Sequence, residues 1–184
     1  MFFPDRIKNI NRKEQVLEVG PGGSPHPRSD VLLEKSFDQK TAEAQRGYAP
    51  AFKTKKKVVF YDSQKFPFKD NEFDYVICSH VLEHVKDVPF FTSELHRVAK
   101  KGYLEFPTVY YDFIYNFHEH ITLLLYRNGK IHFIDKESSG LNDLLSIQRL
   151  FYESLRAGYD SLIVDLKEIF SKDSSGLEES KPVK

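Results

Sequence analysis

The sequence predicts an α/β fold: a doubly wound, mostly parallel β-sheet with an antiparallel hairpin at its edge. Three observations predict it. Short apolar runs rich in β-branched residues alternate with polar or helical segments along the chain. These runs are almost continuously apolar, which is typical of strands buried on both faces. The first run ends in a cluster of glycines, at the place where such sheets bind ligands.

The predicted parallel strands are five short apolar runs. In chain order they are "QVLEVG", "DVLLEK", "KVVFYD", "FDYVICS" and "GYLEFPT". Between the fourth and fifth runs, apolar residues recur at helical spacing from Phe90 to Val98. Two lysines and Gly102 follow, a pattern typical of a helix C-terminus. We therefore expect a helix to connect these two strands.

The later part of the chain is expected to contain a hairpin and then helices. Two alternating runs in "ITLLLYRNGKIHFID" flank Asn128 and Gly129, a dipeptide that favours a type I′ turn. Residues 141–170 carry apolar side chains at helical spacing, and Gly158 is the expected break. Residues 171–184 are polar and are expected to be a disordered tail. We predict a single domain over residues 1–170.

Composition narrows the class of protein. The chain has 184 residues, and 27 basic residues balance 27 acidic ones, so no net charge attracts nucleic acid. The N-terminus lacks a signal-peptide core, and no segment approaches the roughly 20 apolar residues of a membrane span. The single cysteine, Cys78, suits a reducing compartment. We expect a cytoplasmic protein with a small-molecule substrate, without nucleic-acid or membrane partners. The oligomeric state stays open.

The glycine cluster has acidic companions on the next two strands. The first predicted strand ends in "GPGG", where a chain can turn sharply and let a ligand approach the backbone. Glu34 and Asp62 stand at the ends of the second and third strands. A carboxylate there can accept hydrogen bonds from ribose hydroxyls or from an exocyclic amine. The pattern predicts a nucleoside site; the alternative is a tight turn with two solvated acids.

Two segments together resemble a known family. "VLEVGPGG" and "VVFYDSQKFPFKDNEFDYVICSHVLEHVKDVPFFTSELHRVAKKGYLEF" resemble the class I S-adenosylmethionine-dependent methyltransferases of the small-molecule type. The resemblance extends from Val16 to Pro107 and implies a Rossmann-like methyltransferase fold with S-adenosylmethionine as cofactor. It further implies that the glycine turn faces the methionine portion, Glu34 the ribose, and Asp62 the adenine. The full set of implied cofactor residues is Glu18, Gly20, Pro21, Gly22, Gly23, Glu34, Asp62, Ser63, Ser79 and His80.

One departure from the usual pattern concerns the segment after the glycine turn. About 20 residues, including a full helix, ordinarily separate this turn from the ribose acid. Here Gly20 and Glu34 are fourteen positions apart, and Pro21, Pro25 and Pro27 lie between them. No normal helix fits, so we expect a short irregular connector that still offers backbone N–H donors to a ligand.

Candidate catalytic residues follow the fourth and fifth strands. A histidine there could act as a base near neutral pH if the acceptor is a hydroxyl or a protonated amine. In "HEH", two histidines on a strand would share one face while Glu119 points away, so no metal site is expected. Tyrosines in the same region could shape an acceptor pocket or simply pack. The candidates are His80, His84, Tyr111, His118 and His120.

Three functions fit these observations. The first is an S-adenosylmethionine-dependent methyltransferase that acts on a small acceptor. The second is a catalytically inactive cofactor-binding or structural module that keeps the same sheet. The third is a nicotinamide-dependent oxidoreductase, which uses the same kind of glycine turn. The pattern of residues from Asp62 to His84 is not typical of that class. The sequence does not identify the methyl acceptor.

Overall fold

The computed structural model describes residues 3–36, 54–62, 65–143 and 146–151. It divides into two units, residues 1–144 and 145–184, and each is described by itself. In the second unit, residues 147–151 are helical. The predicted tail and most of the predicted C-terminal helices lie outside the described residues. The single domain over residues 1–170 therefore stays a prediction.

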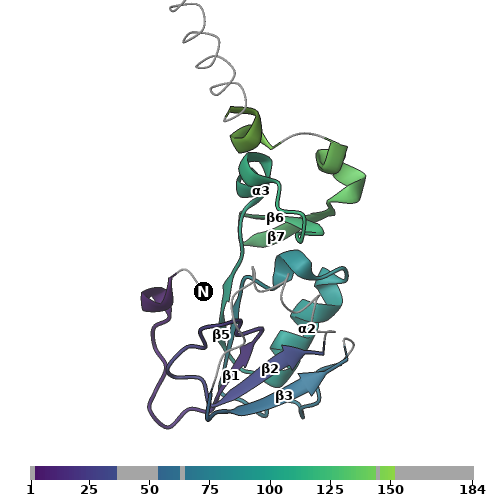
Figure 1. Cartoon of the computed structure of the whole chain (residues 1–184). Coiled ribbons are helices and arrows are strands. Elements are labelled where there is room, and N and C mark those ends of the chain that lie inside the picture. The colour runs from purple at the N-terminus through teal and green to yellow at the C-terminus, as the bar shows by residue number, and fades with distance from the viewer. Residues whose placement is uncertain (1–2, 37–53, 63–64, 144–145, 152–184) are drawn as a thin grey trace, which may run out of the picture. The chain divides into compact units, whose positions relative to one another are not determined.

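The first unit is built on a parallel sheet of five strands (Figure 1). The order across the sheet is β3-β2-β1-β4-β5, and every neighbouring pair is parallel. This is the strand order of doubly wound sheets, with the order reversing between β1 and β4. All five predicted strands are confirmed. Their bounds are β1 (Val16–Val19), β2 (Val31–Lys35), β3 (Lys57–Tyr61), β4 (Tyr75–Ser79) and β5 (Gly102–Glu105).

The two faces of the sheet are covered differently. On one face, the helix α2 (Val88–Val98) packs Phe91 and Leu95 into the main apolar core with Leu17 and Val19 of β1. Asp87 caps this helix by accepting a hydrogen bond from the Phe90 backbone N–H at 2.9 Å. On the other face, partly buried residues of the N-terminal segment and of β5 cover Val16 of β1. They are Ile7, Ile10 and Tyr103.

The crossover from β1 to β2 contains no helix. Residues 20–30 form turns and bends instead, as the three prolines and the short spacing predicted. The connection from β1 to β2 moves across the sheet in one direction, and the connection from β4 to β5 moves in the other. Because such crossovers are right-handed, the two connections lie on opposite faces of the sheet. The short connector and α2 therefore occupy equivalent positions on the two sides of the sheet.

The predicted hairpin is present, but its predicted place at the edge of the main sheet is wrong. The strands β6 (Thr122–Arg127) and β7 (Lys130–Asp135) form a two-stranded antiparallel sheet of their own. Asn128 and Gly129 both have positive φ, as a type I′ turn requires. The strand β6 packs against the first unit's core by its apolar face, because Leu124 belongs to the main core. Thr122 of the same strand donates a hydrogen bond to the Val85 carbonyl at 2.7 Å.

Four shorter helices complete the described part of the first unit. They are η1 (Pro4–Arg6), η2 (Leu82–His84), η3 (Glu137–Ser139) and η4 (Leu141–Asp143). A seven-residue helix, α3 (Val109–Tyr115), follows β5 and ends at Asn116 in the left-handed conformation.

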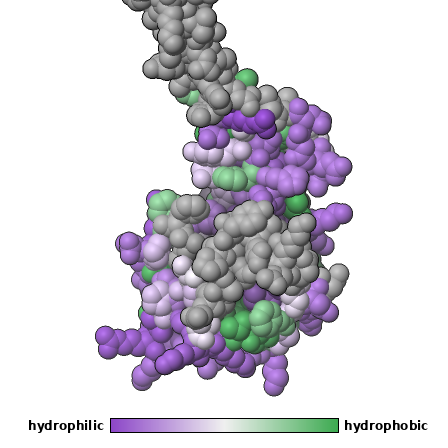
Figure 2. Space-filling view, in the orientation of Figure 1, coloured by the Kyte–Doolittle hydropathy of each residue, from purple (hydrophilic) through white to green (hydrophobic). Residues whose placement is uncertain are grey.

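Within the described residues, no helix has the length and apolar character needed to cross a membrane. Hydrophilic residues predominate over the described surface in the view of Figure 2.

Candidate cofactor site and active site

The glycine turn lies at the end of β1, beside the point where the strand order reverses. Gly20 has φ +62° and donates its backbone N–H to the Leu33 carbonyl at 2.9 Å. A Cβ at this position would clash with Val81 Cγ2, in the loop after β4. Gly22 also has positive φ, but a Cβ there would meet nothing within 4 Å. Gly20 thus permits close packing of two loops, while Gly22 borders open space.

The two predicted nucleoside acids follow neighbouring strands. Glu34 is the penultimate residue of β2, pairs in register with Phe60 of β3, and is half-buried. Asp62 directly follows β3 and is exposed. Because β2 and β3 are parallel neighbours, both acids lie at the edge where the glycine turn ends β1. Ser63, their predicted companion, lies outside the described residues.

The end of β4 is organised around a residue that the sequence analysis missed. The carboxylate oxygen Oε1 of Glu105, the last residue of β5, lies 2.9 Å from Ser79 Oγ and 2.9 Å from His80 Nε2. His80 has φ +56° and donates its backbone N–H to the Glu105 carbonyl at 2.9 Å. Tyr103 also donates its hydroxyl to this carboxylate. Glu105 could have been identified by the same signal as Glu34 and Asp62, because it is an acid at the end of a parallel strand.

Glu18, a predicted cofactor residue, anchors the connector between β1 and β2. Its side chain is buried, and Oε2 accepts hydrogen bonds from Ser29 Oγ at 2.5 Å and from the His26 backbone N–H at 2.8 Å. Burial raises the pKa of this carboxyl above its ordinary value of 4.5, although both hydrogen bonds oppose the shift. Pro21, another predicted cofactor residue, is buried in the same connector, whereas Gly23 is exposed.

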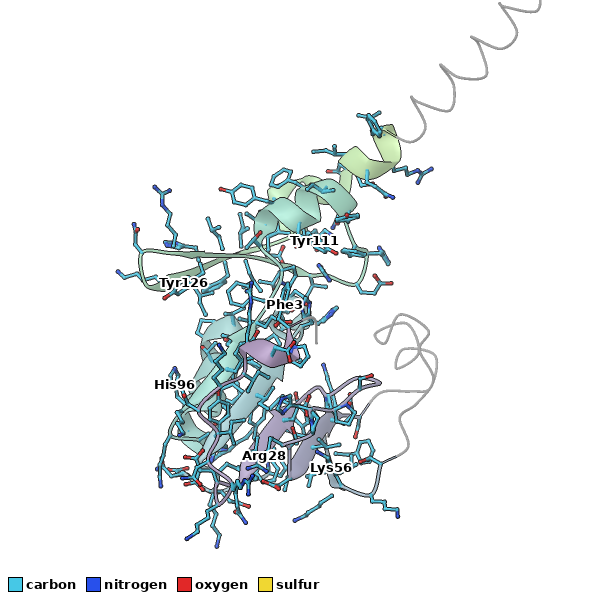
Figure 3. All side chains as sticks on the ribbon, turned by 90° about the vertical axis from the view of Figure 1, so that its left-hand side faces the viewer. Phe3, Arg28, Lys56, His96, Tyr111 and Tyr126 are labelled. Atoms are coloured by element: carbon cyan, nitrogen blue, oxygen red, sulfur yellow. The ribbon has the colours of Figure 1, made fainter. Side chains whose placement is uncertain are left out.

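Lys56, just before β3, also binds the connector, and it lies near Arg28 of the connector in Figure 3. Its ammonium group donates to three backbone carbonyls, those of His26 at 2.7 Å, Pro27 at 3.0 Å and Ser29 at 2.5 Å. These contacts satisfy carbonyl groups that a helix would have paired internally. Sequence reasoning missed this role because the partners lie about thirty positions away along the chain.

The predicted catalytic histidines do not gather at one place, since His80 lies beside Glu105. His84 and His120 come together, with ring centroids 5.1 Å apart and ring planes at 81°. The backbone carbonyl of Glu119 lies 2.8 Å from His84 Nδ1, and Asp112 Oδ1 lies 2.6 Å from His120 Nδ1. His118 is exposed. The expectation that "HEH" lies on a strand is wrong: residues 118–119 form a turn, which directs His118 and His120 into different surroundings.

Tyr111 belongs to an aromatic group on α3 and the turn that follows it. Its ring centroid lies 4.6 Å from that of Tyr115 and 5.7 Å from that of Phe117, and the latter pair is stacked. Tyr111 projects from α3 in Figure 3 and is 37% exposed. The structure thus places it on a partly exposed aromatic surface rather than in the core of a sheet edge.

Comparison with known proteins agrees with this geometry. Residues 29–106 match the family model described as "Methyltransferase domain". The match covers 78 of the 184 residues, so the similarity to methyltransferases concerns this part of the chain. The match begins at the end of the connector and includes β2 to β5, with every predicted site residue from Glu34 to His84. The family implies S-adenosylmethionine as the cofactor.

Individual relatives share only parts of the chain. A 2-phytyl-1,4-naphtoquinone methyltransferase of Nostoc punctiforme is 46% identical over 41 residues, which cover 22% of this chain and 18% of that protein. A solved S-adenosylmethionine-dependent methyltransferase of Thermotoga maritima is 25% identical, with a TM-score of 0.35, over 50% of this chain and 42% of that one. One from Methanosarcina mazei is 18% identical, with a TM-score of 0.37, over 72% and 78% of the two chains. The chain therefore spans less than half of the first two relatives.

The residues at the carboxyl edge of the sheet fit the cofactor that the family implies. The open space beside Gly22 leaves room for a ligand to approach the backbone. Carboxylates at the ends of β2 and β3 are acceptors suited to ribose hydroxyls and to an exocyclic amine. Residues 20–30 contain no helix, so the connector offers this ligand no helix N-terminus.

Proposed function

We propose that this protein transfers the methyl group of S-adenosylmethionine to a small-molecule acceptor. The observation that carries the proposal is the meeting of the glycine turn, Glu34 and Asp62 at one edge of the parallel sheet, in a chain with a methyltransferase domain. The curated relative in Nostoc punctiforme is named a 2-phytyl-1,4-naphtoquinone methyltransferase, which supports an acceptor that is not a macromolecule. The balanced charge of the chain gives no support to a polyanionic acceptor.

In this proposal, residues of three neighbouring strands hold the cofactor. Glu34 accepts hydrogen bonds from the ribose, Asp62 with Ser63 contacts the adenine, and Gly20 and Gly22 face the methionine portion. Ser79 is the last residue of β4 and His80 follows it, beside the reversal of strand order where ligands of doubly wound sheets bind. The proposed role of Glu18 is indirect, since its bonds to Ser29 and His26 fix the connector that carries the turn.

The chemistry asks the protein mainly for alignment. Bound S-adenosylmethionine supplies an electrophilic methyl group on a sulfonium, so the chain must orient the acceptor and exclude water. Both ring nitrogens of His80 lie near carboxylates, Nδ1 3.2 Å from Glu83 Oε1 and Nε2 2.9 Å from Glu105 Oε1. We therefore assign His80 a positioning role in the loop after β4, and no single residue is proposed as the base.

Calorimetric titration of the full chain with S-adenosylmethionine, S-adenosylhomocysteine and NAD tests the cofactor. We expect both adenosyl ligands to bind and NAD not to bind. Replacing Glu34 with Gln should weaken adenosyl binding by about 10- to 100-fold, because hydrogen bonds to a charged acceptor contribute about 1.5–3 kcal/mol. The exposed Glu137 offers a matched control, and Glu137→Gln should leave affinity unchanged.

Two outcomes would contradict the proposal. Absence of binding by a folded protein would show that the shortened turn does not hold a nucleoside. Equal affinity of wild type and Glu34→Gln would remove Glu34 from the site. A release assay for S-adenosylhomocysteine with a panel of phenols, amines and quinols then separates turnover from binding alone. Tight binding without turnover across the panel would favour the inactive module.

A further inference from the structure

Three side chains that could ligate a metal ion meet beside the end of β4. Glu83 and His84 belong to η2, and His120 precedes β6. One potential ligand atom from each lies within 4.8 Å of the other two. The Ile121 backbone N–H donates to the Glu83 carbonyl at 2.9 Å, which fixes the turn carrying His120 against η2. Residues nearly forty positions apart are thereby brought together.

Both histidines are oriented as metal-binding histidines are. The Glu119 carbonyl can only accept a hydrogen bond, so His84 donates from Nδ1, and its Nε2 carries the lone pair. His120 likewise donates from Nδ1 to the buried Asp112 carboxylate. A second ring nitrogen bonded to a backbone carbonyl or a carboxylate is the usual outer partner of a metal-ligating histidine. Each imidazole therefore presents one lone pair.

Glu83 contributes a buried carboxyl group to this cluster. Its side chain is 1% exposed, and within the described residues neither carboxylate oxygen accepts a hydrogen bond. His80 Nδ1 lies 3.2 Å from Glu83 Oε1, and the other ring nitrogen of His80 lies 2.9 Å from Glu105 Oε1. A carboxylate so deeply buried is costly without close partners. A cation coordinated by Glu83 would provide one.

We propose that Glu83, His84 and His120 bind a divalent transition metal ion, with Zn²⁺ as the expected metal. Two imidazoles and one carboxylate form a ligand set that suits zinc and leaves a fourth position open, whereas imidazole is a poor ligand for Mg²⁺ or Ca²⁺. Ligands about 2.0–2.1 Å from a tetrahedral zinc lie about 3.4 Å from each other. The three candidate ligand atoms lie within 4.8 Å of one another, so metal binding would draw them closer together.

The competing explanation is a polar cluster that needs no metal. In that case the bond between Asp112 and His120 serves only to hold the turn before β6 against η2. The two explanations make different predictions for metal binding: the proposed site binds Zn²⁺, whereas a purely structural polar cluster does not. The site does not depend on the proposed methyl transfer, so its test requires neither cofactor nor acceptor.

The test uses the full chain, without an affinity tag and treated with chelator. Calorimetry with Zn²⁺, and visible absorption during titration with Co²⁺, should show one site per chain and a tetrahedral cobalt spectrum that Zn²⁺ abolishes. His120→Gln, His84→Gln and Glu83→Gln should each lower affinity at least about 100-fold, and Asp112→Asn about 10- to 100-fold through the orientation of His120. His118→Gln, two positions from His120 but exposed, should bind as wild type does.

Circular dichroism of each apo variant separates loss of metal binding from loss of folding. Should His120→Gln fail to fold, Asp112→Asn and the wild-type cobalt spectrum still decide. The proposal is overturned if the folded wild type binds no Zn²⁺. It is equally overturned if folded His84→Gln and His120→Gln retain wild-type affinity, or if His118→Gln loses affinity to the same degree.

Discussion

The two crossovers on opposite faces of the sheet are held by different forces. Between β4 and β5, the eleven-residue helix α2 pairs its own backbone groups and buries apolar side chains such as Phe91. Between β1 and β2, residues 20–30 form no helix, and their backbone groups are paired by the Glu18 carboxylate and the Lys56 ammonium. Two buried or half-buried charges thus replace the internal hydrogen bonds of a helix.

This difference teaches how a parallel crossover can be shortened. A chain with prolines cannot form helical hydrogen bonds, so its polar groups need outside partners. The connector pairs with Glu18 of β1 and with Lys56, which directly precedes β3. We expect the α2 side to depend on apolar area, and the connector side to depend on individual hydrogen bonds and on pH.

The largest effect should come from truncating the apolar face of α2. Phe91 is 7% exposed, and its ring meets Phe66 edge to face at 5.4 Å. Phe91→Ala should lower the free energy of unfolding by about 3–5 kcal/mol, because it removes buried surface and leaves a cavity. Urea denaturation measures this. Phe90→Ala, on the exposed side of the same helix, is the matched control and should change stability by less than about 0.5 kcal/mol.

A smaller effect is expected from one hydroxyl in the connector. Ser29→Ala removes the 2.5 Å hydrogen bond to Glu18 and should cost about 1–3 kcal/mol of unfolding free energy, since the acceptor is a buried carboxylate. Ser24→Ala changes the same atoms at an exposed position of the connector and should be nearly neutral. Equal stability of the two variants would show that charge pairing does not hold this crossover.

The smallest effect is a pH dependence assigned to Glu18. Because burial raises its folded pKa above 4.5, the folded state binds more protons than the unfolded state between these two values. The stability contributed by protonated Glu18 is present below pH 4.5 and is lost as the pH rises through the folded pKa. In Glu18→Gln, one oxygen can still accept both hydrogen bonds, so this loss should disappear.

The measurement is urea denaturation of wild type and Glu18→Gln at several pH values. The difference in unfolding free energy, wild type minus variant, should fall as the pH rises above 4.5. Other carboxyl groups cancel in this difference. A difference that is constant with pH, or that increases, would mean that the carboxylate is not destabilised by its burial.

Much of the fold could be predicted because it depends on local patterns. Continuous apolar runs identified all five parallel strands, helical spacing from Phe90 to Val98 identified α2, and Asn128 with Gly129 identified the hairpin turn. The short connector was also predictable, since prolines prevent helical hydrogen bonding whatever surrounds them. The helix α3 was not expected, because "VYYDFIY" is rich in residues that favour strands.

The site was predictable only where strand ends define it. Gly20, Glu34 and Asp62 could be assigned to one edge because parallel strands bring their carboxyl ends together. Glu105, Lys56 and the position of His120 beside η2 depend on contacts between distant segments. The hairpin was expected at an edge of the main sheet, but packing of Leu124 into the core decided its position.

The sequence by itself determined which segments are strands, where α2 lies, and that the first crossover is short. These properties follow from side-chain periodicity and from the fixed φ of proline, which act within a few residues. Only the tertiary structure decided that Glu18 and Lys56 pair the connector, that Glu105 contacts Ser79 and His80, and that Glu83 meets two histidines. Hydrogen bonds and metal ligands need atoms a few ångströms apart, and that proximity is created by the packing of segments distant along the chain.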